Sequence, residues 1–323
     1  MQIEQTQKTK KHLIKDMNYL GLGSAWQDLK RLPNWFKTLL LVGAIIVIFF
    51  NFFSIETLVL DVDAPKEILK YSGTHFAPFI QYAKAYMNGS VIGPANSHGL
   101  ALATAILYSL NGVAAFTGLL SVAMIVNGKM SQFLWGLING VFYAMFALVA
   151  GFIGDFIMNV TFVLGASLGW YLFNYRHKGQ FTIRGRDWYW KTTFFLVVGL
   201  LIVAFTFVWY YLIPEIYNAT LSGSSGTEYV TGTSTHIFDS VGNGVNVVGY
   251  GMQLMNVSEQ FWLWTFLNVW KILQYTPIGL GEGQWVVTLL IQFGVWTILG
   301  LVGLWQNQLK YIYQWARPFI SKK

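Results

Sequence analysis

The sequence has no cysteine and little charge. Without cysteine the chain forms no disulfide, binds no metal through thiolates and has no thiol nucleophile. Charged residues make up 11% of the chain and hydrophobic residues 54%, whereas a soluble domain carries about 25% charged residues. A chain of 323 residues with so little charge cannot cover a water-facing surface, so most of its surface is expected to face lipid.

Signatures of catalysis, cofactor binding and secretion are missing as well. There is no Walker-type loop and no Gly-x-Ser-x-Gly elbow, and no histidine pair has metal-ligand spacing on a helix. The first 35 residues are polar and basic and lack the short apolar core of a cleavable signal peptide. We expect no enzyme, cofactor or metal site. The histidines all fall in expected loops or tails: His12, His75, His98, His177 and His236.

Long apolar runs are abundant. A helix that spans a bilayer needs about 20 mostly apolar residues, because lipid cannot satisfy exposed backbone groups. The sequence therefore predicts an all-α membrane protein with about eight transmembrane helices. The expected spans are 37–56, 102–126, 133–153, 156–175, 192–213, 240–256, 261–276 and 285–306.

The basic residues predict the orientation of these spans, since Lys and Arg favour the cytoplasmic side. With eight spans and both termini inside, nearly all of the positive charge is cytoplasmic, so the net charge of +7 reports topology and nucleic-acid binding is not expected. The residues on that side are Lys8, Lys10, Lys11, Lys15, Lys30, Arg31, Lys37, Lys129, Arg176, Lys178, Arg184, Arg186, Lys191, Lys310, Arg317, Lys322 and Lys323.

Three regions follow from this layout. Residues 1–36 form a basic cytoplasmic segment, 37–100 hold the first span and an external loop, and 101–323 form a domain with the remaining spans. In loop 57–100 the residues Phe79, Tyr82 and Tyr86 recur at helical spacing, which predicts an interfacial helix. Residues 218–235 are rich in Gly, Ser and Thr and are expected to form a flexible external linker.

Two motifs occur twice in the third region. Asn111–Val113 matches Asn243–Val245, and Trp135–Asn139 matches Trp264–Asn268 as Trp-x-x-apolar-Asn. Spans two to four (about 102–175) thus resemble spans six to eight (about 238–309), with a linker helix at about 192–213. The charge-derived topology gives both triplets the same orientation, so they are predicted to be parallel repeats.

Aromatic and amide side chains share faces on these helices, because positions i, i+3, i+4 and i+7 lie together. A flat aromatic surface beside amide groups suits a planar ring carrying a polyol, since Asn and Gln both donate and accept hydrogen bonds. Such residues also serve as interfacial anchors and interhelical contacts. The substrate-binding candidates from these stripes and from the repeat are Gln132, Trp135, Asn139, Phe261, Trp264, Asn268, Asn111, Asn243, Tyr250 and Gln253.

Ionisable residues within spans are scarce. Lys271 lies near the outer end of its span and is expected to reach the interface. Asp155, Asp239 and Glu259 fall at span ends, so no carboxylate is expected deep in the membrane. Because ion-coupled transport usually needs such a group, we expect downhill transport.

The order and spacing of several short motifs between Leu110 and Leu309 resemble the PnuC family of bacterial nicotinamide riboside transporters. These motifs are Gly118–Val122, Asn127–Lys129, Gly154–Asp155, Gly169–Tyr171, Gln253–Met255, Glu259 and Trp264–Asn268. The chain departs from the family pattern at Phe261 and Phe173, where the family often has Trp, and Phe173 joins the binding candidates.

The resemblance implies a SWEET-like fold of three plus one plus three helices, preceded here by one N-terminal helix. It also implies uniport, a homo-oligomer such as a trimer, and retention of the substrate through phosphorylation by a cytoplasmic kinase. Three hypotheses stay open at this point: transport of nicotinamide riboside; transport of a neutral (deoxy)nucleoside, thiamine or riboflavin; and a non-transporting membrane scaffold or lipid-modifying enzyme.

Overall fold

A computed structural model describes residues 19–52, 106–107, 110–149, 152–175, 182–183, 186–220, 233–276, 287–311 and 313. Every regular element among these residues is a helix, which confirms the predicted all-α class. Segment 57–100, with Phe79, Tyr82 and Tyr86, lies outside the described residues, as do His12, His75, His98 and His177.

Two short elements precede the first long helix, and the other long helices follow in the order the apolar runs predict. The elements are η1 (Tyr19–Gly21), α2 (Ala25–Lys30), α3 (Asn34–Phe52), α7 (Asn111–Val126), α8 (Gln132–Val149), α9 (Ile153–Tyr175), α10 (Trp188–Thr220), α12 (Thr233–Leu254), α13 (Gln260–Gln274), α15 (Val287–Leu304) and the π-helical η3 (Trp305–Leu309).

Several helices have the length and composition of membrane spans. Within the described ranges, three segments are long and apolar enough to cross a membrane: Ile153–Asn174, Trp188–Ala219 and Leu289–Leu309. Three shorter apolar helices accompany them: Asn34–Phe50, Asn111–Val126 and Gln132–Leu148. The protein is therefore a multi-pass membrane protein, while the count of eight crossings stays a prediction.

Six helices form a closed ring. Around it, α7 contacts α8, α8 contacts α9, α9 contacts α12, α12 contacts α13, α13 contacts α15, and α15 returns to α7. The three helices of each predicted repeat are thus neighbours, and the last helix of each triplet meets the first helix of the other. This order is the one that parallel repeats require, although the repeat itself stays a prediction.

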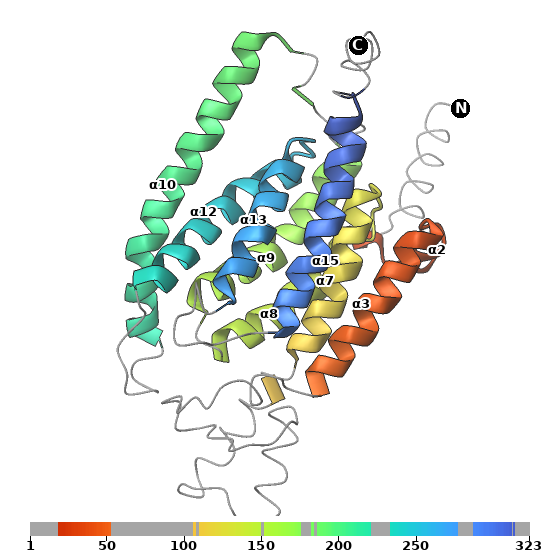
Figure 1. The fold of residues 1–323 in the computed structure, drawn as a ribbon, viewed down its shortest axis with the longest axis horizontal. Helices are drawn as coiled ribbons and strands as arrows, with labels where there is room; N and C mark the ends of the chain where they lie inside the picture. Colours follow the sequence, from red (N-terminus) through yellow and green to blue (C-terminus); the bar gives the residue numbers. More distant parts are fainter. Residues whose placement is uncertain are drawn as a thin grey trace, which may run out of the picture.

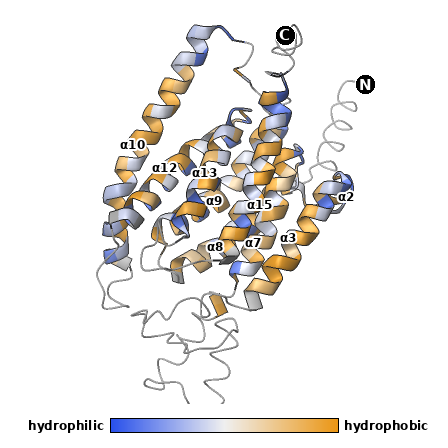
Figure 2. Ribbon diagram, viewed as in Figure 1, coloured by the Kyte–Doolittle hydropathy of each residue, from blue (hydrophilic) through white to orange (hydrophobic). Residues whose placement is uncertain are grey.

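Helices α3 and α10 lie outside the ring. Figure 1 places them on opposite sides of the bundle, α3 against α7 and α15, and α10 against α12. Figure 2 shows hydrophobic residues along most of both helices and hydrophilic residues gathered toward helix ends. With 33 residues, α10 is about 50 Å long, which exceeds the roughly 30 Å of a bilayer core. Its outward side chains are suited to lipid.

One end of the bundle collects the connections that carry positive charge. The Ser131 amide before α8 donates to Asp28 of α2 at 3.3 Å, and Glu259 before α13 accepts from the Ile183 amide at 3.0 Å. Figure 1 shows the start of α10 and the end of α15 at this same end. We call it the basic end; its described cations are Lys30, Arg31, Lys37, Lys129, Arg186, Lys191 and Lys310.

The polar sixth span differs most from its prediction. Helix α12 begins at Thr233, although the span was expected to begin at residue 240, so part of the expected linker 218–235 is helical. The polar residues Asp239 and Ser240 in this part of the helix are buried within the protein, so they do not face lipid. His236 therefore lies in a helix and not in a loop, with Nε2 at 2.7 Å from the carbonyl of Tyr210.

Candidate functional site

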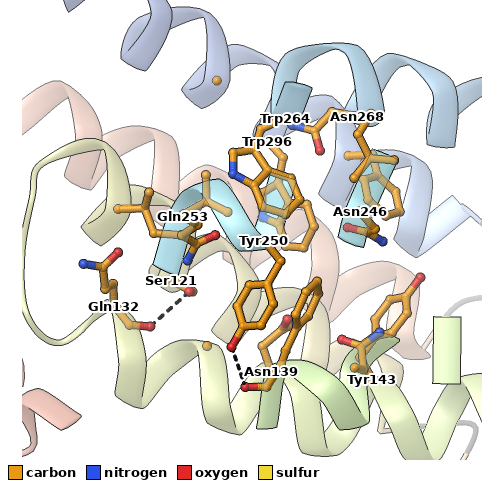
Figure 3. Close-up of a pocket in the computed structure, with 18 of the residues that line it drawn as sticks. Ser121, Gln132, Asn139, Tyr143, Asn246, Tyr250, Gln253, Trp264, Asn268 and Trp296 are labelled. Atoms are coloured by element: carbon orange, nitrogen blue, oxygen red, sulfur yellow. Dashed lines mark hydrogen bonds between the residues drawn. The ribbon is translucent and has the colours of Figure 1, made fainter. Parts of the chain in front are cut away.

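The ring encloses a cavity of about 130 Å³. All six ring helices contribute side chains to its wall, and neither α3 nor α10 does. Figure 3 shows polar and aromatic groups from helices far apart in the sequence converging on this space. The two predicted repeats thus meet at the cavity, which is where a transporter built from repeats holds its substrate.

Four amide side chains line the cavity without a hydrogen-bond partner among the described residues: Gln132, Asn246, Gln253 and Asn268. A fifth, Asn139, uses its nitrogen to donate to the Ala114 carbonyl at 2.7 Å. Buried polar groups are nearly always hydrogen-bonded, so amides left open in one cavity are matched to the polar groups of a ligand. Together they offer both donors and acceptors.

Two indole rings belong to the aromatic part of the wall. Trp264 lines the cavity, and its nitrogen donates to Gln260 at 3.3 Å. Trp296 of α15 also lines the cavity, and its buried indole nitrogen has no acceptor within the described part of the chain. Figure 3 shows both tryptophans among the residues that line the cavity. Trp296 therefore offers a donor as well as a surface.

Two glycines let these groups reach the cavity. A Cβ on Gly118 of α7 would lie 2.6 Å from the Trp296 ring and 2.8 Å from the Asn139 amide. A Cβ on Gly165 of α9 would clash with the Tyr250 ring and hydroxyl. Glycine is required at both positions because a bulky partner side chain approaches the backbone closely.

An ionic cluster closes the end of the cavity away from the basic end. Lys271 of α13 places Nζ 2.7 Å from Oδ1 of Asp155 on α9 and 3.8 Å from Oδ1 of Asp239 on α12. All three side chains are buried, with 2%, 3% and 7% of their surface exposed. Asp155 and Lys271 line the cavity, and Asp239 lies behind them.

Neutral groups complete the surroundings of each carboxylate. The hydroxyls of Tyr275 and Tyr143 donate to Oδ2 of Asp155, the latter at 3.4 Å. Asp239 accepts from the Asn243 amide at 2.9 Å and from the Gln274 amide at 3.4 Å. Buried charges need such partners, because desolvation is otherwise too costly.

Two expectations about charge are wrong. Lys271 does not reach the interface, because Asp155 and Asp239 hold it inside the ring. Asp155 does lie at the start of its span, in the first turn of α9, but it is buried against Lys271; Asp239 lies within α12 because that helix starts earlier than expected. Buried carboxylates are therefore present inside the ring, and their expected absence does not support downhill transport.

Glu259 also has a different environment from the one expected. It is buried at the start of α13, at the basic end, and accepts hydrogen bonds from Thr182, Ile183 and Gln308 at 3.1, 3.0 and 3.2 Å. These bonds join the segment before α10, the start of α13 and η3 at the basic end, away from the cavity. Among the described residues no group of three or more His, Cys, Asp or Glu could hold a metal ion.

The cavity brings together seven of the candidates that the sequence pointed to: Gln132, Asn139, Tyr250, Gln253, Phe261, Trp264 and Asn268. Their contact with a substrate stays a prediction.

Four candidates lie elsewhere. Trp135 packs against the cluster of α3, α7 and α15 residues, and Phe173 packs against Phe133 at 5.7 Å between ring centroids. Asn243 turns toward Asp239, and Asn111 is buried at the start of α7. Trp135 repeats the motif of Trp264. However, Trp135 packs against residues of α3, α7 and α15, whereas Trp264 lines the cavity.

The sequence analysis missed several cavity residues. Asn246 lies about one turn beyond Asn243 on α12. The face predicted for α12 included Asn243, whereas Asn246 is the amide that lines the cavity. Trp296 carried no repeat motif, and Asp155 was expected only as a carboxylate at a span end and as part of a Gly-Asp motif. A search for polar residues on every face of the ring helices would have included them. The cavity residues missed are Ser121, Tyr143, Asp155, Asn159, Asn246, Lys271 and Trp296.

Comparison with known proteins bears on this site. A crystal structure of the vitamin B3 transporter PnuC is similar, with a TM-score of 0.47 and 20% sequence identity over 79% of this chain and 99% of that chain. The comparison with curated proteins found no match. The model of the nicotinamide mononucleotide transporter family matches residues 108–315, which contain the whole ring and every residue of the cavity. The chain therefore belongs to the nicotinamide mononucleotide transporter family, the PnuC family of membrane transporters.

Proposed function

We propose that the protein imports nicotinamide riboside or a close analogue by facilitated diffusion. The observation that carries this proposal is the set of four open amides and two indole rings on one cavity. An aromatic base stacks on an indole at a gain of about 1–3 kcal/mol. Ribose hydroxyls both donate and accept hydrogen bonds, as do the amides around them.

The charge of the cavity favours the riboside over the mononucleotide. Lys271 is the single lysine or arginine among the described lining residues, and two carboxylates already hold it. Phosphate groups are usually bound by Arg or Lys side chains that are free to pair with them. A phosphorylated substrate would face Asp155 without a free cation.

Rejection of phosphorylated compounds also fits the proposed means of retention. If a cytoplasmic kinase phosphorylates the imported riboside, a carrier that refuses the phosphate cannot release the product. Downhill transport followed by phosphorylation then accumulates the vitamin without an ion gradient. The buried carboxylates are compatible with this scheme because Lys271 pairs with Asp155, the carboxylate that lines the cavity.

The proposal includes the arrangement in the membrane. We place the protein in the bacterial cytoplasmic membrane with eight spans and both termini in the cytoplasm. The support is the gathering of described cations at the basic end, since Lys and Arg favour the cytoplasmic side. We further propose that residues 101–323 act as the transporter domain and that the protein forms a homo-oligomer, such as a trimer.

Ligand binding by the purified protein tests the substrate. Isothermal titration in detergent compares nicotinamide riboside with nicotinamide mononucleotide, thiamine, riboflavin and a deoxynucleoside. We expect the riboside to bind most tightly and the mononucleotide at least about tenfold more weakly, because its phosphate meets a carboxylate. Tighter binding of any other ligand would reassign the substrate. Binding of none would contradict the proposal.

A further inference from the structure

The position of the Lys271 ammonium is itself a cation site on the wall of the cavity. It lies 2.7 Å from the Asp155 carboxylate and 5.8 Å from the centre of the Tyr275 ring. A carboxylate and an aromatic face are the two groups that attract an organic cation. In the structure the lysine of the protein occupies this position.

The cluster carries one more negative charge than positive charge. Two carboxylates surround one ammonium, and all three are buried. A buried charge without compensation is costly, so the cluster favours a second cation nearby. Of the two carboxylates, Asp155 lines the cavity, so it is the one that a ligand meets.

Asp239 offers Lys271 a second carboxylate. Nζ is 3.8 Å from that carboxylate, and the amides of Asn243 and Gln274 adjoin it. Within the described part of the chain, the buried oxygens Oδ1 of Asn243 and Oε1 of Gln274 have no donor. These side chains therefore leave acceptors near Asp239 for an additional donor.

The end of the lysine lies against Gly242 of α12: a Cβ there would be 3.2 Å from Cε and 3.4 Å from Nζ. The absence of a side chain at residue 242 lets the lysine approach α12, the helix that carries Asp239. When Lys271 moves away, Asp155 keeps the hydroxyls of Tyr143 and Tyr275 on Oδ2, and Oδ1 becomes available.

We propose that Asp155 selects a positively charged substrate, and that Lys271 neutralises Asp155 in the empty carrier and transfers to Asp239 when the substrate binds. This inference rests on the proposed function, since the nicotinamide riboside ring carries a positive charge. Lys271 thus acts as an internal substitute for the substrate cation. Asp155 is then paired with one positive charge in both states, Lys271 in the empty carrier and the substrate in the loaded carrier. This suits a carrier that must return empty.

The test compares two forms of one molecule that differ mainly in charge. Nicotinamide riboside is a cation, and its 1,4-dihydro form is neutral. Titration calorimetry gives the ratio of their affinities for the wild type and for Asp155→Asn, Asp239→Asn and Glu259→Gln. Glu259 is the matched control, a buried carboxylate at the other end of the bundle and away from the cavity.

We expect the wild type to prefer the cation. Asp155→Asn should lower the preference by about tenfold or more, because a charge-assisted contact is lost. Asp239→Asn keeps the pair of Lys271 with Asp155, and should weaken binding of the cation while the neutral form binds as before. Glu259→Gln should leave the ratio unchanged.

Each other outcome has a definite meaning. An equal loss of both ligands in Asp155→Asn and Asp239→Asn would show a purely structural cluster and would overturn this inference alone. If a folded Asp155→Asn protein keeps the wild-type ratio of affinities for the cationic and neutral forms, this inference alone is also overturned. If Asp155→Asn does not fold, the Asp239→Asn protein decides. Weaker binding of the cation with unchanged binding of the neutral form supports the inference, and an equal loss of both forms overturns it. Failure of the wild type to bind either form would overturn the proposed function together with this inference.

Discussion

The ammonium of Lys271 and the carboxylate of Asp155 form a buried ion pair, with Nζ and Oδ1 2.7 Å apart, although the two residues are 116 positions apart in sequence. Lys271 belongs to the second predicted repeat and Asp155 to the first. The pair therefore joins the two halves of the ring, on the wall of the cavity and at the end away from the basic residues.

Removal of the lysine should destabilise the protein. Lys271→Met leaves two buried carboxylates without their cation, and breaking a buried pair in this way costs about 3–5 kcal/mol. Thermal unfolding in detergent should show a clearly lower melting temperature. The double variant with Asp155→Asn should recover part of the loss, because it leaves fewer unpaired charges. Equal melting temperatures for the wild type and Lys271→Met would contradict the pairing.

Loss of the Trp264 indole should weaken substrate binding. Trp264→Ala removes about 1–3 kcal/mol of stacking, which corresponds to roughly tenfold to hundredfold in affinity for nicotinamide riboside. Trp262→Ala is the matched control on the same helix, since Trp262 is 43% exposed and does not line the cavity. Near wild-type binding by a folded Trp264→Ala protein would show that this residue only packs.

A methyl group at residue 165 should displace Tyr250 in the wall of the cavity. In Gly165→Ala the new Cβ would meet Tyr250, which must then shift within the wall. We expect weaker binding with a modest loss of stability. Gly251→Ala on α12 is the control, because a Cβ there meets nothing within 4 Å. That variant should bind normally and be as stable as the wild type or more so, since Ala favours helix by about 1 kcal/mol over Gly.

The eight-span arrangement predicts opposite sides for two segments. A reporter fused after Lys323 should be cytoplasmic, and one inserted at 221–232, between α10 and α12, should be external. The physical reason is the gathering of Lys and Arg at one end of the bundle. Reporters on the same side of the membrane would rule out this arrangement.

The sequence predicts the fold well where helices face lipid. The apolar runs at α3, α8 and α10 located those helices because lipid demands continuous apolar surface. The same rule failed at the start of α12, where Asp239 and its neighbours face protein. Hydropathy cannot distinguish a polar helix start inside a ring from a loop.

The candidate site is only partly predictable for a similar reason. Helical periodicity placed Trp264 and Asn268 on one face, and both line the cavity. Periodicity does not reveal what that face meets, so Trp135 was chosen although it packs against α3, α7 and α15. The ion pair of Lys271 with Asp155 depends on contact between α13 and α9, which a pattern within one helix cannot reveal.

Uptake into liposomes tests the central proposal most directly. The purified protein is reconstituted, and labelled nicotinamide riboside is followed with and without imposed proton and sodium gradients, with protein-free liposomes as the control. The account predicts protein-dependent uptake that stops when the internal concentration equals the external one, whatever the gradient. Accumulation of unmodified riboside above the external concentration, driven by either gradient, would contradict it, as would the absence of protein-dependent uptake.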